Sequence, residues 1–260
     1  MEKMGRGLYW TLYGAADERA RKQLGGAYGL AFEAYLHSRL RDMPGGRTRY
    51  IESPMFADGT QLCDALFVEG SELVVCEFKS SVLRADAKCS GRGEVLFPEL
   101  QKKFVTGDET GPKGVAQFER GIRKLLEGKE KVTALPPQKW RLIRPVMVTL
   151  DSAMTCAGMS AYLNDHFDRG AIRSQYRTAI APLIIIDVRE YELLLPDITA
   201  YGFSELLESY WRSYFIPVAD QFYKFTRANI PFLEDKPPLE DYAKEKFTQL
   251  VATLPRLFRA

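Results

Sequence analysis

The sequence has few cysteines and histidines and no long apolar run. Its 260 residues include 4 cysteines and 2 histidines, and no two cysteines form the CxxC pair typical of zinc and redox sites. This scarcity does not fit a secreted disulfide scaffold. The strongest apolar runs, such as APLIIIDV at residues 181–188, are far shorter than a membrane span, and the first residues lack the apolar segment of a signal peptide. We therefore expect a soluble, cytoplasmic protein without a membrane partner.

The sequence also lacks an excess of charge of either sign. Lys and Arg number 36 against 34 Asp and Glu, so the formal net charge is only +2. This balance neither requires nor excludes a polyanionic partner, and any nucleic-acid surface would have to be local. Hydrophobic residues make up 46% of the chain, which is ordinary for one large globular domain, or for one domain with an extension.

No internal repeat is evident, so periodicity and helix-breaking residues have to indicate the secondary structure. They predict a helix over residues 20–42, with Leu30, Leu36 and Leu40 near one face. Glycines and a proline break the pattern over 82–114, which we interpret as a surface insertion around a short helix. Elsewhere we expect strands at 48–56, 62–69, 71–80, 141–150 and 181–188, and helices at 114–129 and between the last two strands.

This order of elements predicts an α/β fold, in which a mixed central β-sheet is flanked by helices. Residues 1–190 are assigned to that domain, and residues 191–260 to a helical C-terminal extension or subdomain. Aromatic residues recur with helical spacing in the extension, which favours a core over a base-stacking platform. The same residues would also suit an interface, either with a second copy of the chain or with a partner protein.

Three charges lie inside the most core-like segment, LCDALFVEGSELVVCEFKSS at residues 62–81. Glu69 and Glu72 are explained by a turn around Gly70, but Asp64 and Glu77 are not. If residues 70 and 71 form a two-residue hairpin loop, Asp64 and Glu77 become direct cross-strand partners. A three-residue loop would shift this register.

Two carboxylates in direct opposition destabilise a hairpin, so a positive charge is expected between them. Lys79 lies on the same strand face as Glu77 and can supply part of that charge. Mg²⁺ or Mn²⁺ explains the pair better, because these hard cations take carboxylate oxygens and leave positions for water and phosphate. The alternative is an Asp and a Glu at solvated strand ends, with Lys79 in a surface ion pair.

Asp64, followed after a strand–turn–strand spacer by Glu77-Phe78-Lys79, resembles the PD-(D/E)xK signature of the restriction-endonuclease-like nuclease superfamily. Cys63 stands where the loosely kept proline of the motif would be. The resemblance covers about residues 25–150 and implies that Asp64, Glu77 and the backbone carbonyl of Phe78 ligate the metal. Lys79 would orient the attacking water or stabilise developing negative charge.

Two further residues match the superfamily pattern. Glu33 stands where a helix before the sheet often contributes a metal-binding glutamate, and Gln117 stands where the helix after the motif often carries a glutamine that positions water or phosphate. Each also has a simpler explanation, as a solvated residue on the surface of its helix. His37 lies one turn from Glu33 and is open to a secondary role near the metal.

The resemblance implies a Mg²⁺-dependent (or Mn²⁺-dependent) nuclease that acts on DNA, an endonuclease more than an exonuclease, as in restriction, repair or antiviral defence. The alternative is a catalytically inactive, nuclease-like module for nucleic-acid binding or assembly. Phosphate contacts would give salt-sensitive affinity, although a solvated basic surface explains the same residues. The lysines predicted for these contacts are Lys102, Lys103, Lys113 and Lys124.

Overall fold

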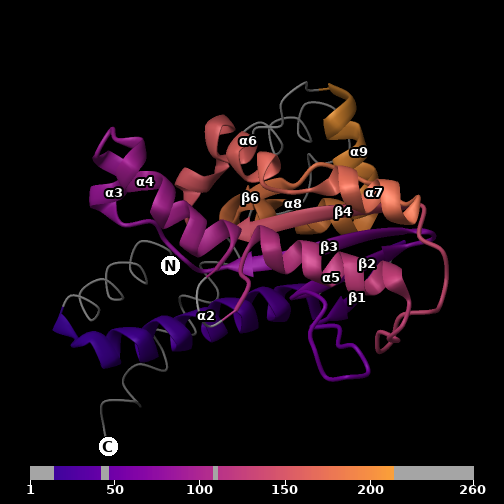
Figure 1. Cartoon of the computed structure of the whole chain (residues 1–260). Coiled ribbons are helices and arrows are strands. Elements are labelled where there is room, and N and C mark those ends of the chain that lie inside the picture. The colour runs from indigo at the N-terminus through magenta and orange to yellow at the C-terminus, as the bar shows by residue number, and fades with distance from the viewer. Residues whose placement is uncertain (1–14, 42–46, 108–110, 214–260) are drawn as a thin grey trace, which may run out of the picture. The chain divides into compact units, whose positions relative to one another are not determined.

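The computed structural model describes residues 15–41, 47–107 and 111–213. The chain has two compact units, and the larger one begins at Gly29. The described part of the larger unit, residues 29–213, holds the β-sheet and every residue predicted for the active site. Figure 1 shows the order of its elements along the chain.

Helix α2 (Glu18–Arg41) is the helix that the sequence predicts over residues 20–42. Its later turns bury Phe32, Leu36 and Leu40, whereas Leu30 is 70% exposed. The predicted apolar face is therefore wrong at Leu30. Residues 32, 36 and 40 are spaced by four and stay on one side of the helix, while residue 30 is about 200° away from residue 32 at 3.6 residues per turn.

Among the described residues, the strands form one mixed six-stranded sheet in the order β1-β2-β3-β4-β5, with β6 also paired to β4. β1, β2 and β3 are antiparallel neighbours, and β3, β5 and β6 run parallel to β4. The predicted mixed sheet is confirmed, although the two-residue β5 had no sequence signal. The bounds are β1 Arg49–Glu52, β2 Ala65–Glu69, β3 Glu72–Lys79, β4 Leu142–Thr149, β5 Ala179–Ile180 and β6 Ile184–Asp187.

The β2–β3 hairpin has the register that a two-residue loop predicts. Glu69 is paired with Glu72, and the ladder continues to Ala65 and Cys76. Gly70 has a φ of 60°, as the first loop residue of a type II′ turn requires. The regular ladder stops at Asp64, one residue before Ala65. The Asp64 amide donates to the carbonyl of Cys76, although Cys76 is the partner of Ala65 in the ladder. Asp64 is therefore displaced from strict opposition to Glu77.

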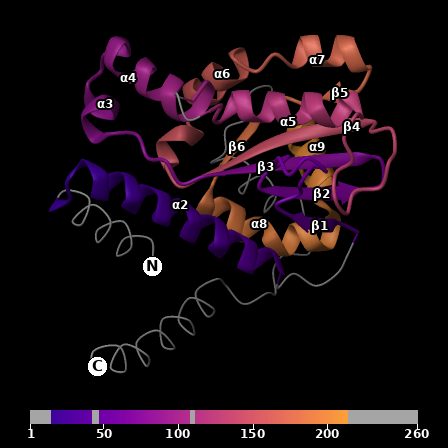
Figure 2. The same ribbon diagram turned by 60° about the horizontal axis from the view of Figure 1, so that its bottom comes forward.

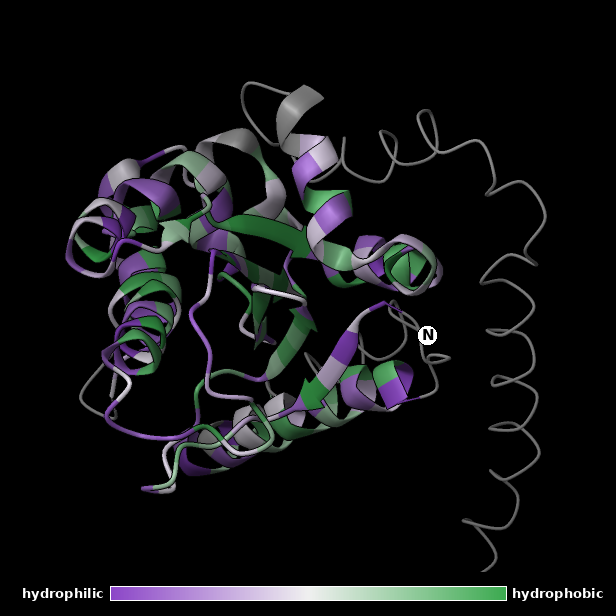
Figure 3. Ribbon diagram, turned by 90° about the vertical axis from the view of Figure 1, so that its right-hand side faces the viewer, coloured by the Kyte–Doolittle hydropathy of each residue, from purple (hydrophilic) through white to green (hydrophobic). Residues whose placement is uncertain are grey.

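Helices pack on both faces of this sheet, with α5, α6 and α7 on one side and α8 on the other (Figure 2). On the first side Val75 of β3 shares a buried cluster with Phe118 of α5. On the second, the ring of Phe78 lies 6.2 Å from that of Tyr191. The strands between these layers are strongly hydrophobic (Figure 3). The bounds are α5 Val115–Glu127, η2 Ser152–Thr155, α6 Ala157–Asp165, α7 Arg169–Tyr176, α8 Val188–Tyr201 and α9 Phe203–Ser213.

The segment 82–114 is not the surface insertion that its glycines suggest. It contains α3 (Ala85–Cys89), α4 (Gly93–Leu100) and the π-helix η1 (Gln101–Val105). Leu83, Leu100 and Phe104 are buried in the main hydrophobic cluster. Because these apolar residues are separated by polar and glycine-rich stretches, the sequence shows no single period that would predict a core element.

The predicted boundary between residues 190 and 191 falls within α8. The division into a domain and an extension stays a prediction, because residues 214–260, with most of the aromatic segment and the last predicted helix, lie outside the described residues. None of the helices in the described ranges combines the length and the apolar character needed to cross a membrane.

Candidate active site

Asp64 lies directly before β2 and points its carboxylate toward β3. Its Oδ2 accepts a hydrogen bond from the Phe78 amide at 2.6 Å, and its Oδ1 accepts one from the Gln61 amide group at 3.1 Å. The residue is 8% exposed. Two donors therefore fix the carboxylate while leaving oxygen lone pairs available to a further partner.

Glu77 is the most deeply buried acid of the site. It has no exposed surface, its Oε2 accepts from Lys79 Nζ at 2.9 Å, and its Oε1 has no hydrogen-bond partner among the described residues. Burial raises its pKa from 4.5 to about 8; Lys79 opposes this shift and Asp64 adds to it. Without a further cation, Glu77 is thus mostly protonated at neutral pH.

Lys79 connects β3 to helix α5. Its ammonium donates to Glu77 and, at 3.0 Å, to Oε1 of Gln117. Burial acts to lower the pKa of Lys79, but the negative charges of Glu77, Asp64 and Glu33 outweigh it and raise the pKa. The lysine therefore stays positively charged, and its ammonium donates both to Glu77 and to Gln117.

Two glycines let α5 reach this position. A Cβ at Gly121 would lie 2.5 Å from the Leu62 carbonyl oxygen, and Gly114 precedes α5 with a φ of 55°, where a Cβ would lie 1.9 Å from the Phe104 carbonyl oxygen. Only glycine fits at these distances. Gly121 thus brings the helix against the loop that leads to Asp64, and Gln117 one turn earlier meets Lys79.

Glu33 reaches the site from α2, on the other side of the sheet. Its Oε1 lies 3.4 Å from His37 Nε2 and 3.5 Å from the Ser53 hydroxyl. Its charge contributes to the raised pKa of Lys79. Of the five residues that the sequence predicts for catalysis, Asp64, Glu77, Lys79 and Gln117 thus interact in a chain, and Glu33 acts on Lys79 through its charge.

A divalent cation fits the pair formed by Asp64 and Glu77. Two adjacent carboxylates with one unpartnered buried oxygen form a donor set that suits Mg²⁺ or Mn²⁺, which commonly take one or two carboxylates and fill other positions with water and substrate phosphate. Within the described ranges, no group of three or more His, Cys, Asp or Glu side chains is arranged to hold a metal ion. Glu33 is therefore near this pair without completing a three-ligand group.

The lysines predicted to contact nucleic acid differ in their surroundings. Lys103 contacts Glu99 at 2.6 Å and the Val82 carbonyl at 2.8 Å, and Lys124 pairs with Asp58. Lys102 is exposed, and Lys113 is partly buried. Intramolecular contacts thus already engage Lys103 and Lys124, and the role of the four lysines in binding stays a prediction.

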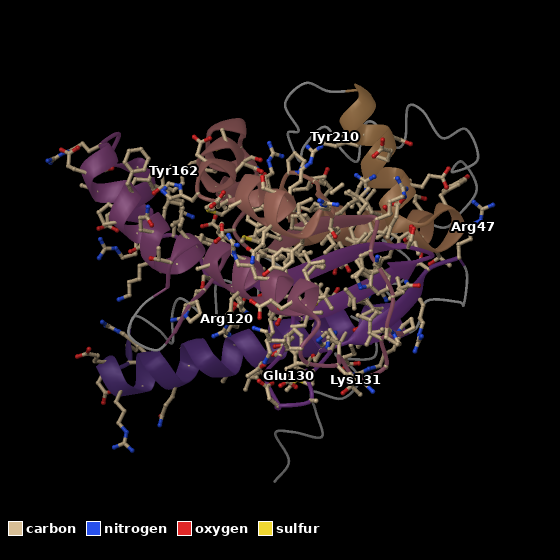
Figure 4. The ribbon with its side chains drawn as sticks, turned by 45° about the vertical axis from the view of Figure 1, so that its right-hand side comes forward. Arg47, Arg120, Glu130, Lys131, Tyr162 and Tyr210 are labelled. Atoms are coloured by element: carbon tan, nitrogen blue, oxygen red, sulfur yellow. The ribbon has the colours of Figure 1, made fainter. Side chains whose placement is uncertain are left out.

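Two cavities of the described chain lie apart from the carboxylate cluster. One, of about 430 Å³, follows α5 beyond Gln117; two of its lining residues, Arg120 and Glu130, are labelled in Figure 4. The other, of about 470 Å³, lies near the hairpin turn beside Glu72 and Arg144. The predicted chemistry therefore lies outside both cavities.

Comparison with known proteins identifies no family for the chain. No protein-family model matches it, and no curated protein matches it either. Among solved structures, the small subunit of the heterodimeric restriction endonuclease R.BspD6I aligns with a TM-score of 0.37 and 10% identity, over 76% of this chain and 89% of that chain. A likeness at this level carries no functional argument, which must come from the residues themselves.

Sequence reasoning missed three residues around the cluster. Gln61 binds Asp64, while Tyr50 and Ser53 contact His37. Tyr50 lies on β1 and Ser53 directly follows it, whereas Gln61 lies in the segment that leads to β2; none of the three belongs to a motif. Only the antiparallel pairing of β1 with β2 reveals that the segment of Tyr50 and Ser53 runs past Asp64.

Proposed function

We propose that the protein is a metal-dependent nuclease that hydrolyses phosphodiester bonds, with DNA as the substrate and internal cleavage as the mode of action. The observation that carries the proposal is the wholly buried Glu77, placed beside Asp64 and bonded to a lysine that is itself held by Gln117. A protein gains no stability from a buried carboxyl with an unpartnered oxygen, so a functional demand accounts for it better.

Asp64 and Glu77 would hold Mg²⁺ or Mn²⁺, with the Phe78 carbonyl and Glu33 as further candidates. The bound ion would lower the pKa of a water molecule and neutralise charge on the scissile phosphate. Lys79 would donate to the phosphate oxygens as negative charge develops on them, since its ammonium is already directed into the cluster. Gln117 would keep that ammonium in place through its Oε1.

The test is incubation of the full chain with circular and linear DNA and with RNA, in Mg²⁺, in Mn²⁺ and in a chelator. We expect metal-dependent cleavage that opens the circular DNA, which an exonuclease could not do. Asp64→Ala and Lys79→Ala should keep the fold, measured by circular dichroism, and lose cleavage. Lys129→Ala, which removes an exposed lysine beyond α5, is the matched control. Undiminished cleavage by either site variant would refute the assignment.

A second candidate is a nuclease-like module that binds nucleic acid without cutting it. The observation in its favour is the ion pair between Lys79 and Glu77, together with the missing third metal ligand in the part of the chain that the structure describes. Binding of DNA without cleavage in any metal, and without heat of metal binding in calorimetry, would support this module instead. The role in restriction, repair or antiviral defence is part of the first proposal.

A further inference from the structure

Ser53 has a strained backbone at a position next to the candidate site. It directly follows β1 and has a φ of 40°; in the described ranges only Ala134 and Arg177 are further non-glycine residues with positive φ. This region is unfavourable for residues with a Cβ. Ser53 also precedes Pro54, and a residue before proline prefers an extended conformation. Strain of this kind persists only where the surroundings enforce it.

The backbone of Ser53 is tied to Asp64. The Ser53 amide donates to the Asp64 carbonyl at 2.9 Å. This bond continues the pairing of β1 with β2 one residue beyond Glu52 and Ala65. The conformation of Ser53 and the position of the Asp64 backbone are thus fixed together.

The side chain of Ser53 points to a second carboxylate, that of Glu33. Its hydroxyl lies 3.5 Å from Glu33 Oε1 and 3.4 Å from His37 Nε2, and His37 Nε2 lies 3.4 Å from the same Glu33 oxygen. These three groups form a triangle of long hydrogen bonds. Such bonds often shorten once a site is occupied.

His37 is oriented so that it can donate within this triangle. It is 3% exposed, its ring lies 5.4 Å from that of Phe78, and its Nδ1 contacts the Tyr50 hydroxyl. Burial, aided by Glu52, raises the pKa of Tyr50, so the phenol keeps its proton. In the tautomer in which the Tyr50 hydroxyl donates to Nδ1, the imidazole proton lies on Nε2, which faces Glu33 and Ser53.

We infer that Ser53 is a positioning residue, which with His37 holds Glu33 at a fixed separation from Asp64. The backbone of Ser53 fixes Asp64, and its hydroxyl fixes Glu33. One residue thus couples helix α2 to the start of strand β2. This inference rests on the proposed function, because Asp64 and Glu33 matter as a pair only if both act on the same metal and phosphate. Residues that orient metal ligands in this way typically contribute about 10- to 100-fold to metal affinity or activity.

The experiment compares Ser53→Ala and Ser53→Gly with the unaltered full chain. Both variants lose the hydroxyl, but glycine relieves the backbone strain and alanine keeps it. We measure the affinity for Mn²⁺ by calorimetry, the Mn²⁺ concentration at half-maximal cleavage, and Tm. We expect both variants to bind Mn²⁺ about 10-fold more weakly, while Tm of the glycine variant exceeds that of the alanine variant.

Arg177→Gly is the matched control. Arg177 follows α7 with a φ of 57°, so its replacement also relieves strain, but away from the cluster. We expect a raised Tm and unchanged Mn²⁺ affinity. If this control weakens Mn²⁺ binding as much as Ser53→Gly does, a general effect on the fold replaces the positioning role.

The outcomes separate this inference from the proposed function. If the unaltered chain binds Mn²⁺ and cleaves DNA, and Ser53→Gly does both equally well, the hydroxyl has no positioning role and the inference is overturned alone. The same holds if Ser53→Ala matches the unaltered chain. If the unaltered chain neither binds Mn²⁺ nor cleaves, the proposed function fails and the positioning role fails with it.

Discussion

The β2–β3 hairpin carries two acids at each end, and the rest of the fold treats the two ends differently. At the turn, Glu69 accepts hydrogen bonds from the Phe203 and Ser204 amides at 2.6 and 3.0 Å, and so caps the N-terminus of α9. Glu72 pairs with Arg141 and accepts a bond from the Ser204 hydroxyl. Cations and a helix N-terminus therefore compensate both acids of the turn.

At the open end of the hairpin, away from the turn, the partners of the two acids Asp64 and Glu77 are incomplete. Asp64 has its two donors, but Glu77 has one bonded oxygen and one without a partner among the described residues. Lys79 is the single cation recorded in contact with Glu77 in the described chain, and it also acts on Asp64. Two acids that face each other across a hairpin are thus not a functional signal by themselves. What distinguishes the open end is a buried carboxyl group, that of Glu77, with one oxygen that has no partner among the described residues.

The comparison is tested most strongly by neutralising one acid at each end. We expect Asp64→Asn to reduce kcat for DNA cleavage by about a hundredfold to a thousandfold, the size of a lost electrostatic contribution in a transition state. Glu69→Gln, at the turn, should keep the kcat of the unaltered chain, because Glu69 contacts α9 and not the cluster. Both are measured by initial rates at saturating metal. Equal losses in the two variants would show that the ends do not differ in function.

A second test uses the pH dependence of stability. The pKa of Glu77 is raised from 4.5 to about 8 by burial, so between these values the folded state holds a proton that the unfolded chain has lost. The contribution of this proton to the free energy of unfolding is complete below pH 4.5 and is lost as pH rises to about 8. At about 1.4 kcal/mol for each pKa unit, the loss amounts to a few kcal/mol.

Urea denaturation from pH 5 to pH 8 without metal measures the slope of the unfolding free energy against pH. Glu77→Gln should flatten the slope and be more stable than the unaltered chain at pH 8, since an amide carries no charge to bury. Glu69→Gln should keep the slope, because Glu77 is unchanged in it. If the Glu77→Gln variant keeps the slope, the pH dependence of stability belongs to other groups.

The register of the hairpin could be predicted from the sequence because it is a local property. Gly70 and Ser71 fix the loop length, and alternation then places Glu77 and Lys79 on one face. Glu33 and Gln117 could be placed near the cluster only through the resemblance of the motif, since helix periodicity does not show where a helix end lies on a sheet.

The partners of the turn acids could not be predicted. The sequence explains Glu69 and Glu72 by the turn around Gly70, yet Glu69 contacts Phe203, which lies 134 residues further along the chain. The shift of Asp64 out of the ladder was missed for a related reason. It goes with the bond from the Asp64 amide to the Cys76 carbonyl, at a point where Asp64 also pairs with Ser53 beyond β1, and no turn signal links these segments.

A smaller effect is expected at the turn. Glu69→Ala removes the acceptor of two amides at the start of α9 and should cost about 1–2 kcal/mol of unfolding free energy, the usual cost of a lost helix cap. Urea denaturation measures it, and kcat per folded molecule should be unchanged. Ser209→Ala, later in the same helix, serves as a control for α9 itself. A fall in kcat without a fall in stability would mean that the turn communicates with the cluster.

The smallest expected effect is the release of one proton when metal binds. Because Glu77 is mostly protonated at pH 7, binding of Mn²⁺ by its carboxylate should release about one proton. Calorimetry in two buffers of different ionisation enthalpy counts it. Glu77→Gln should release none, and Glu69→Gln should release as much as the unaltered chain. Release that does not depend on Glu77 would place the metal on other groups, and the unpartnered carboxyl of Glu77 would then no longer distinguish the function of the two ends of the hairpin.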